Sequence, residues 1–157
     1  MQYEIIRATG EHLIACAAIL AHSDIGRVYF DTEQEIWDSL AVGIASEEVY
    51  VAADRNTNCM GFIWFVYKAS FHSFPYLHII AVDERHRGRG IGRALLAFYE
   101  DLIFPEYSKT FLVVADFNPR ARQLYERLGY QKVGEIPGLY RKGITEYLMM
   151  KARPENP

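Results

Sequence analysis

The fold is decided by the stretch Leu77-His78-Ile79-Ile80-Ala81-Val82-Asp83-Glu84-Arg85-His86-Arg87-Gly88-Arg89-Gly90-Ile91-Gly92-Arg93-Ala94-Leu95-Leu96. Its first residues, up to Val82, are mostly apolar and rich in Ile, which predicts a buried strand. A charged, glycine-rich turn follows, and an apolar-periodic run then predicts a helix from about Ile91 to Leu102. This order predicts an anion-binding site, because the first amides of a helix lack intrahelical partners and glycine lets an oxyanion approach the backbone.

The turn is basic, but it does not match the two best-known phosphate-binding motifs. A dinucleotide-binding fingerprint starting at Gly88 and Gly90 would need a third glycine where Arg93 stands, and a Walker loop would need a lysine that the turn lacks. The sequence instead reads Arg87-x-x-Gly90-x-Gly92. This resembles the acyl-coenzyme A signature of the GNAT N-acetyltransferases, usually written Gln/Arg-x-x-Gly-x-Gly/Ala. Taken alone, this motif is equally compatible with a basic turn that is simply solvated. If the turn binds phosphate, four cations are available for the phosphate oxygens: Arg85, Arg87, Arg89 and Arg93.

Composition limits the protein class. The 157 residues are 50% hydrophobic and 14% aromatic, which is enough for a real core and excludes global disorder. The formal charge of −3 argues against general binding to nucleic acid or to a membrane surface, so the basic turn is a local feature. Cys16 and Cys59 show no metal-ligand spacing, so we expect reduced thiols and no metal site.

We expect no targeting signal at the N-terminus. Met1-Gln2-Tyr3-Glu4 shows no basic region followed by an apolar stretch, so we expect no signal peptide. The apolar stretches are also shorter than the roughly 20 residues that a membrane helix needs. We therefore expect a cytoplasmic protein without membrane contact.

The rest of the chain predicts a mixed α/β protein. A capping box is predicted from Thr32 to Glu35, Tyr29–Thr32 is expected to be a loop, and Phe71–Pro75 an aromatic loop. The resulting order, β-α-α-β-β-β-α-β-α-β-β, predicts one twisted mixed sheet with helices on its faces. Beyond the opening stretch, strands are expected at 3–8, 48–53, 61–67, 111–115, 131–135 and 145–150, and helices at 9–21, 32–44 and 119–128.

A second motif extends the resemblance. It is Asn118-Pro119-Arg120-Ala121-Arg122-Gln123-Leu124-Tyr125-Glu126-Arg127-Leu128-Gly129-Tyr130, with Asn118 as the expected helix cap and Gly129 as the stop. It is similar to the GNAT helix Asn-x-x-Ala-x-x-Leu/Phe-Tyr-x-x-x-Gly-Phe/Tyr, and the element order is also that of the GNAT fold. The resemblance implies one GNAT domain over residues 1–157, in which we expect the tail at 151–157 to be frayed.

The resemblance implies acetyl-coenzyme A as acyl donor and a primary amine as acceptor, in a small molecule or at a protein N-terminus, with direct transfer in a ternary complex. From the acidic net charge we expect no nucleic-acid partner, and a homodimer stays open. By position, strand backbone would bind the pantetheine arm and the turn would bind the pyrophosphate. The coenzyme-binding residues are then Ile80, Ala81, Val82, Arg87, Gly88, Arg89, Gly90, Ile91, Gly92, Arg93, Asn118 and Tyr125.

The resemblance also implies residues for proton transfer. Tyr125 stands where GNAT enzymes often place a tyrosine that protonates the coenzyme thiolate, although a core tyrosine would also fit there. Tyr76-Leu77-His78-Ile79-Ile80-Ala81-Val82 resembles the His-Leu-His-x-x-Ala-Val strand of arylalkylamine N-acetyltransferases. His78 is therefore the candidate base, but Tyr76 replaces the first histidine, and a lone histidine in a strand is more often a core residue. Alternative carboxylates are Glu33, Glu35 and Glu84.

The acceptor is the least defined part of this hypothesis. Acidic and aromatic side chains near the expected acceptor regions, namely Tyr29, Glu33, Trp64 and Tyr140, would suit a cationic amine, a protein N-terminus or a polyamine. Two other functions stay open. A non-catalytic acyl-coenzyme A sensor would use the same fold, and an RNA-binding domain would use the basic turn but conflicts with the acidic net charge. Sequence alone leaves open the acceptor, the base, the oligomeric state and whether the acyl group is only acetyl.

Overall fold

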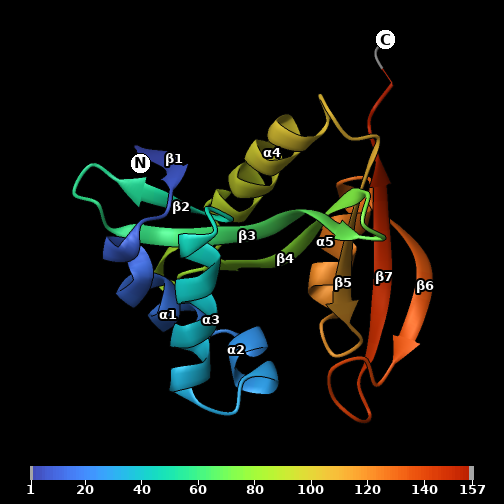
Figure 1. Cartoon of the computed structure of the whole chain (residues 1–157), viewed down its shortest axis with the longest axis horizontal. Coiled ribbons are helices and arrows are strands. Elements are labelled where there is room, and N and C mark those ends of the chain that lie inside the picture. The colour runs from blue at the N-terminus through green and yellow to red at the C-terminus, as the bar shows by residue number, and fades with distance from the viewer. Residues whose placement is uncertain (1, 156–157) are drawn as a thin grey trace. The chain divides into compact units, whose positions relative to one another are not determined.

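A computed structural model describes residues 2–155 and divides them into two compact units. The first unit contains the chain up to Phe65 together with Ile79–Leu102, and the second contains Val66–His78 together with the chain from Ile103 onward. Two strands, β3 (Cys59–Ser70) and β4 (Phe74–Val82), contribute to both units (Figure 1). Whether the whole chain is one domain stays a prediction. Asn156 and Pro157, expected in the tail, lie outside the described residues, whereas Lys151 and Ala152 belong to the last strand.

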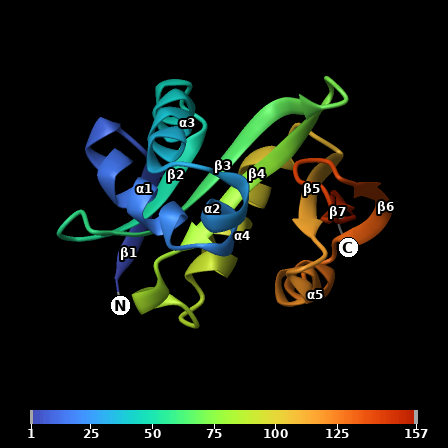
Figure 2. The same ribbon diagram turned by 90° about the horizontal axis from the view of Figure 1, so that it is seen from below.

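The first unit packs helices on both faces of its strands. Along β2, Val49 and Val51 point into a core shared with two helices, while Tyr50 points to the other face, where its ring contacts Phe98. The elements are β1 (Tyr3–Arg7), a 3-10 turn η1 (Gly10–His12), α1 (Leu13–Ala21), α2 (Asp24–Tyr29), α3 (Glu33–Ala45), β2 (Val49–Asp54), a 3-10 turn η2 (Glu84–His86) and α4 (Ile91–Ile103), of which all but the last residue of α4 lie in this unit. In both ribbon views α1 and α3 lie side by side (Figure 2).

The helix α2 corrects the expectation of a loop at Tyr29, which is its last residue. Its start signals are present in the sequence, because Ser23 caps the helix by accepting a hydrogen bond from the Gly26 amide at 3.1 Å. Gly26 has to be glycine, since a Cβ there would lie 1.9 Å from the carbonyl oxygen of Leu20. A helix of six residues shows too little periodicity to be recognised from apolar spacing.

The predicted capping box of α3 is confirmed on one side and shifted on the other. The Thr32 hydroxyl accepts from the Glu35 amide at 3.2 Å, as expected. The Glu35 carboxylate reaches back to the amide of Asp31 at 2.8 Å rather than to that of Thr32. The capping contact therefore extends one residue further and accounts for Glu35 as a structural residue.

The second unit is built on three further strands. They are β5 (Lys109–Ala115), β6 (Gln131–Pro137) and β7 (Thr145–Ala152), and α5 (Pro119–Arg127) lies between β5 and β6 in the chain. Asn118 caps α5 as predicted, its Oδ1 accepting from the Ala121 amide at 3.2 Å. The guanidinium of Arg122 lies 4.5 Å from the ring centroid of Tyr147, so α5 packs on the face of β7 that carries this ring.

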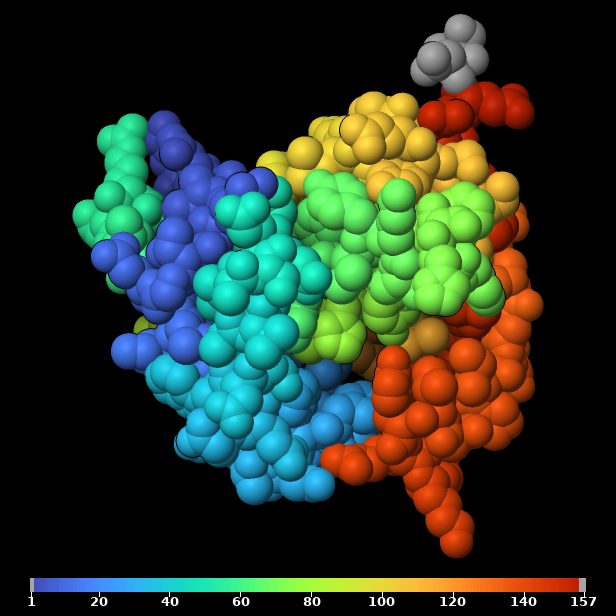
Figure 3. All heavy atoms as spheres, in the orientation of Figure 1, coloured from blue at the N-terminus to red at the C-terminus, as the bar shows by residue number. Residues whose placement is uncertain are grey.

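The strands follow the order β1-β2-β3-β4-β5-β7-β6. β4 pairs with β5 in parallel, whereas β1–β2, β2–β3, β5–β7 and β6–β7 are antiparallel pairs. The predicted mixed α/β fold is thereby confirmed. Strands β3, β4 and β6 are longer than predicted. The connection from Gly138 to Ile144, coloured orange, protrudes from the surface in Figure 3. No helix among residues 2–155 is long and apolar enough to cross a membrane.

Candidate functional site

The glycine-rich turn of the first unit has the conformation of an anion-binding turn. β4 ends at Val82 and α4 starts at Ile91, and between them Gly88 and Gly90 adopt φ angles of +75° and +82°. A Cβ at either glycine would meet no heavy atom within 4 Å, so the space over the turn is open. The first bond of the helix runs from the Ala94 amide to the Gly90 carbonyl at 3.0 Å. The amides before Ala94 therefore have no partner inside the helix.

Arg85 is held within the turn by Asp83. Its Nε and Nη2 donate to the two carboxylate oxygens at 3.0 and 2.7 Å, and its backbone amide donates to the same carboxylate at 2.9 Å. These contacts, with the guanidinium bonds first among them, lower the pKa of Asp83 to about 2. The charge of Arg85 is thus balanced locally by Asp83, and the other arginines of the turn are Arg87, Arg89 and Arg93. The binding of Arg85 by Asp83 was not predicted from the sequence. The spacing of the two residues, an aspartate two positions before an arginine, was the available signal.

The turn is fixed in place by β3. The Asp83 amide donates to the carbonyl of Met60 at 2.9 Å. A Cβ at Gly61 would lie 2.9 Å from the carbonyl oxygen of Ala81, so only glycine permits this approach of the two strands. The Arg87 Nε also donates to the carbonyl of Val82 at 3.2 Å. The end of β4 and the glycine turn therefore form one anchored segment.

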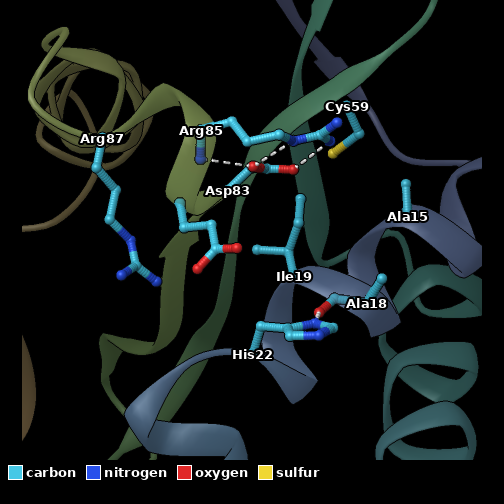
Figure 4. A pocket seen from close by; sticks show the side chains of 9 residues that line it. Ala15, Ala18, Ile19, His22, Cys59, Asp83, Arg85 and Arg87 are labelled. Atoms are coloured by element: carbon cyan, nitrogen blue, oxygen red, sulfur yellow. Dashed lines mark hydrogen bonds and ion pairs between the residues drawn. The ribbon is translucent and has the colours of Figure 1, made fainter.

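A pocket of about 250 Å³ lies between α1 and this segment (Figure 4). In the close-up the paired Asp83 and Arg85 lie at one side and His22 at the other, where its Nδ1 donates to the Ala18 carbonyl at 2.7 Å. One part of the pocket wall is small and apolar, and the rest carries acidic and basic side chains. Its lining is Ala15, Ala18, Ile19, His22, Cys59, Asp83, Glu84, Arg85 and Arg87.

Tyr125 lies on α5 in the second unit, with its ring in edge contact with that of Tyr130 at 5.6 Å between centroids. The residue as a whole is partly exposed, yet burial of its hydroxyl raises the pKa to about 12. The phenol is therefore protonated throughout the neutral range and is able to donate a proton.

A group of polar side chains surrounds Tyr76 in the same unit. The Tyr76 hydroxyl lies 3.3 Å from the Tyr140 hydroxyl, and its ring lies 6.0 Å from that of His78. Burial, then the hydrogen bond with Tyr140 and the nearby charge of Glu146, raise the pKa of Tyr76. Glu146 is a carboxylate with only 3% of its surface exposed, in β7. Sequence reasoning missed Glu146, although an acidic residue inside an apolar strand is an unusual feature.

The remaining predicted site residues differ in their surroundings. Trp64 is 7% exposed, its indole donates to Glu48 at 2.9 Å and its ring packs on Gly43, which accounts for it as a core residue. Glu33 is exposed at the start of α3, and Tyr29 is partly buried. The predicted site residues therefore fall into two groups. In the first unit the glycine turn follows Ile80–Val82 in the chain, and in the second unit His78, Tyr140 and Tyr125 lie near Tyr76.

The His78 imidazole is neutral around pH 7. The residue as a whole is exposed on β4, yet burial of its imidazole lowers the pKa from the usual 6.5. Because the unfolded chain then binds the proton more readily, the stability due to neutral His78 is complete above pH 6.5 and is lost as the pH falls through the folded pKa.

Replacing His78 by glutamine is therefore expected to reduce the loss of stability on the acid side. Urea unfolding of the wild type and the variant should give a constant difference at neutral and higher pH. Below a pH of about 6.5, the wild type should lose more stability than the variant. Parallel losses in the two proteins would show that His78 is not desolvated in the fold.

Comparison with known proteins identifies a protein family whose sequence model matches this chain. A sequence model of the Acetyltransferase (GNAT) family matches residues 9–130. The N-alpha-acetyltransferase RimI of Mycobacterium tuberculosis is 35% identical over 104 residues, which are 65% of this chain and 65% of that protein. The spermidine N(1)-acetyltransferase of Vibrio cholerae is 28% identical over 109 residues, which are 68% of this chain and 62% of that enzyme.

The solved structures agree on the fold. The structure of Ard1 from Thermoplasma volcanium matches with a TM-score of 0.82 at 22% identity, over 99% of this chain and 100% of that one. At this identity the match shows the fold alone. The chain spans between 30% and 65% of the length of the curated relatives it matches.

Proposed function

The chain belongs to the GNAT acetyltransferase family, and on that premise we propose that it is an N-acetyltransferase using acetyl-coenzyme A. The acetyl group would pass directly to a primary amine of a small molecule or a protein N-terminus, within a ternary complex. One observation carries the proposal: the open turn at Gly88 and Gly90 follows β4 and η2 and leads into the start of α4. Unpaired amides at that end of the helix, together with its positive dipole, suit the pyrophosphate of a coenzyme.

The residues of the turn fit such a coenzyme. The open volume at Gly88 and Gly90 is a cradle that a Cβ would fill, and Arg87 and Arg93 stand at either end of it. The backbone of Ile80–Val82 would hold the pantetheine arm. Asn118 already uses its Oδ1 to cap α5, so it would contribute its amide nitrogen. The coenzyme supplies the activated acetyl thioester.

The protein would handle two protons. An amine must be neutral to attack, and His78, with its lowered pKa, is unprotonated at neutral pH and able to accept the amine proton. Tyr125, with its pKa of about 12, is protonated at neutral pH, so its hydroxyl would donate to the departing sulfur as negative charge develops there. The two groups thus hold opposite protonation states at the same pH, as a base and an acid must.

The acceptor would be a cation in solution, because primary amines are protonated near neutral pH. Glu33 and the aromatic rings of Tyr29 and Tyr140 are the contacts that we propose for it, since carboxylates and ring faces attract ammonium groups. The names of the relatives point to two acceptor types, a protein N-terminus and spermidine. Both carry the primary amine that the proposal requires.

Acetyl-coenzyme A is expected to raise the melting temperature in a concentration-dependent way. At 100 times its Kd it should add about 2.7 kcal/mol of stability. For a chain of this size, that corresponds to a shift of about 5–10 °C. Pantetheine, which lacks the pyrophosphate, is the control and should shift the melting temperature much less. The absence of any shift at millimolar acetyl-coenzyme A would contradict the proposal.

A further inference from the structure

The chain's two cysteines meet in the core of the first unit. Cys16 lies on α1 and Cys59 is the first residue of β3, and their exposed fractions are 0% and 8%. Both are free thiols, both belong to the same core cluster, and their side chains are close enough for each to shift the pKa of the other. Nothing in the proposed acetyl transfer uses them.

The two thiols differ in access. Cys59 lines the pocket of Figure 4 together with Ala15, which precedes Cys16 on α1, and Ile19, which lies three residues after it, while Cys16 itself is sealed from solvent. The hydrogen bond from Cys16 lowers the pKa of the Cys59 thiol, and the same contact, followed by burial, raises the pKa of Cys16. A solute that enters the pocket therefore meets Cys59 first, and Cys59 is the better nucleophile of the two.

Cys59 is also mechanically connected to the glycine turn. Its neighbour Met60 accepts the hydrogen bond from the Asp83 amide at 2.9 Å, and Asp83 holds Arg85 by two further bonds. The Cys59 thiol itself donates to the carbonyl of Gly61 at 3.4 Å. A displacement at the start of β3 would therefore be transmitted to the segment that leads into the turn.

We propose that Cys16 and Cys59 are a redox site, which a hydroperoxide converts into an intramolecular disulfide that distorts the glycine turn. The Cys59 sulfur attacks the terminal peroxide oxygen, the O–O bond breaks, and the alcohol (water, for hydrogen peroxide) leaves with the thiol proton. The Cys16 sulfur then attacks the resulting sulfenic acid, the S–O bond breaks and water leaves with the second proton. Two thiols and one peroxide thus give one disulfide, one alcohol and one water.

The disulfide should weaken coenzyme binding. An S–S bond is about 2.05 Å long, much shorter than a hydrogen-bonded thiol contact, so its formation pulls the start of β3 towards α1. This consequence rests on the proposed function, because it assumes that the turn binds acetyl-coenzyme A. We expect the affinity to fall on the order of fivefold or more, the lower range of coupling between two sites.

The experiment treats the whole protein with hydrogen peroxide and measures its intact mass, its free thiols and its affinity for acetyl-coenzyme A. The expected result is the loss of two hydrogen atoms and of both thiols, weaker binding, and recovery of all three after reduction. Cys16→Ala leaves Cys59 without its partner, so peroxide should produce a sulfenic acid that dimedone traps. Cys59→Ala is the matched control and should keep its affinity under peroxide.

Two outcomes would overturn the redox site. Both thiols could persist in peroxide, or Cys59 could be oxidised beyond the sulfenic acid while Cys16 stays reduced. A disulfide that leaves the affinity unchanged would overturn its effect on the turn. If the reduced protein fails to bind acetyl-coenzyme A, the proposed function is wrong, while formation of the disulfide would still establish the redox site.

Discussion

Replacing Gly90 by valine is expected to abolish the rise in melting temperature that acetyl-coenzyme A produces. Gly90 adopts a φ of +82°, where a β-branched side chain is strained by about 1–3 kcal/mol, so the variant should also melt at a lower temperature by itself. More importantly, the new side chain would fill the open space over the turn, where we place the pyrophosphate. Thermal melts with and without coenzyme separate the loss of binding from the loss of stability.

Gly143 provides the matched control. It has a φ of +84°, a Cβ there would also meet nothing within 4 Å, and it lies in the connection between β6 and β7. Gly143→Val therefore carries the same backbone strain away from the glycine turn, and it should keep the full coenzyme-induced shift. A folded Gly90→Val protein that binds the coenzyme normally would show that the turn is not the anion site.

Replacing Tyr125 by phenylalanine is expected to lower kcat by on the order of 10²–10⁴, the usual effect of losing a positioned acid. The ring remains in contact with Tyr130, so the stability should change by only about 1 kcal/mol. The loss should be equal in kcat and in kcat/KM, because the proton is donated only as negative charge develops on sulfur. Coenzyme affinity should hardly change.

Tyr130→Phe is the control for Tyr125→Phe. It removes a second phenol from the same ring pair but leaves Tyr125 in place, so turnover should be close to that of the wild type. If Tyr125→Phe loses stability yet retains near-normal turnover, Tyr125 is a core residue and the acid has to be sought elsewhere. Stability and turnover are both measured on these two variants, and turnover also requires one acceptor amine.

Much of the fold followed from local signals in the sequence. The strand, glycine turn and helix at 77–96 and the Asn118 cap were predictable because periodicity, glycine and a capping residue agree in each segment. The short helix α2 was not, because its six residues offer a cap but no repeated apolar face. The strands extended beyond their apolar runs because pairing with a neighbouring strand, such as the register pairing of Pro137 with Thr145, does not require apolar side chains.

The candidate site could be predicted only where its geometry is set by neighbouring residues in the sequence. The conformation of Gly88 and Gly90 follows from the glycines themselves. The retention of Arg85 by Asp83 and the grouping of Tyr76 with Tyr140 depend on side-chain positions in the fold. The last two residues are 64 apart in the chain, and no pattern of spacing predicts that their hydroxyls meet.

The most direct test of the proposed acetyltransferase is turnover with a panel of amines. Acetyl-coenzyme A and the protein are incubated with peptides bearing free N-termini, with spermidine and with small arylalkylamines, while free thiol release and the acetylated product are measured together. We expect equal amounts of thiol and acetylated amine with at least one acceptor, and the loss of both in Tyr125→Phe. Coenzyme binding without product from any of these amines would contradict the proposal and would indicate an acyl-coenzyme A-binding module instead.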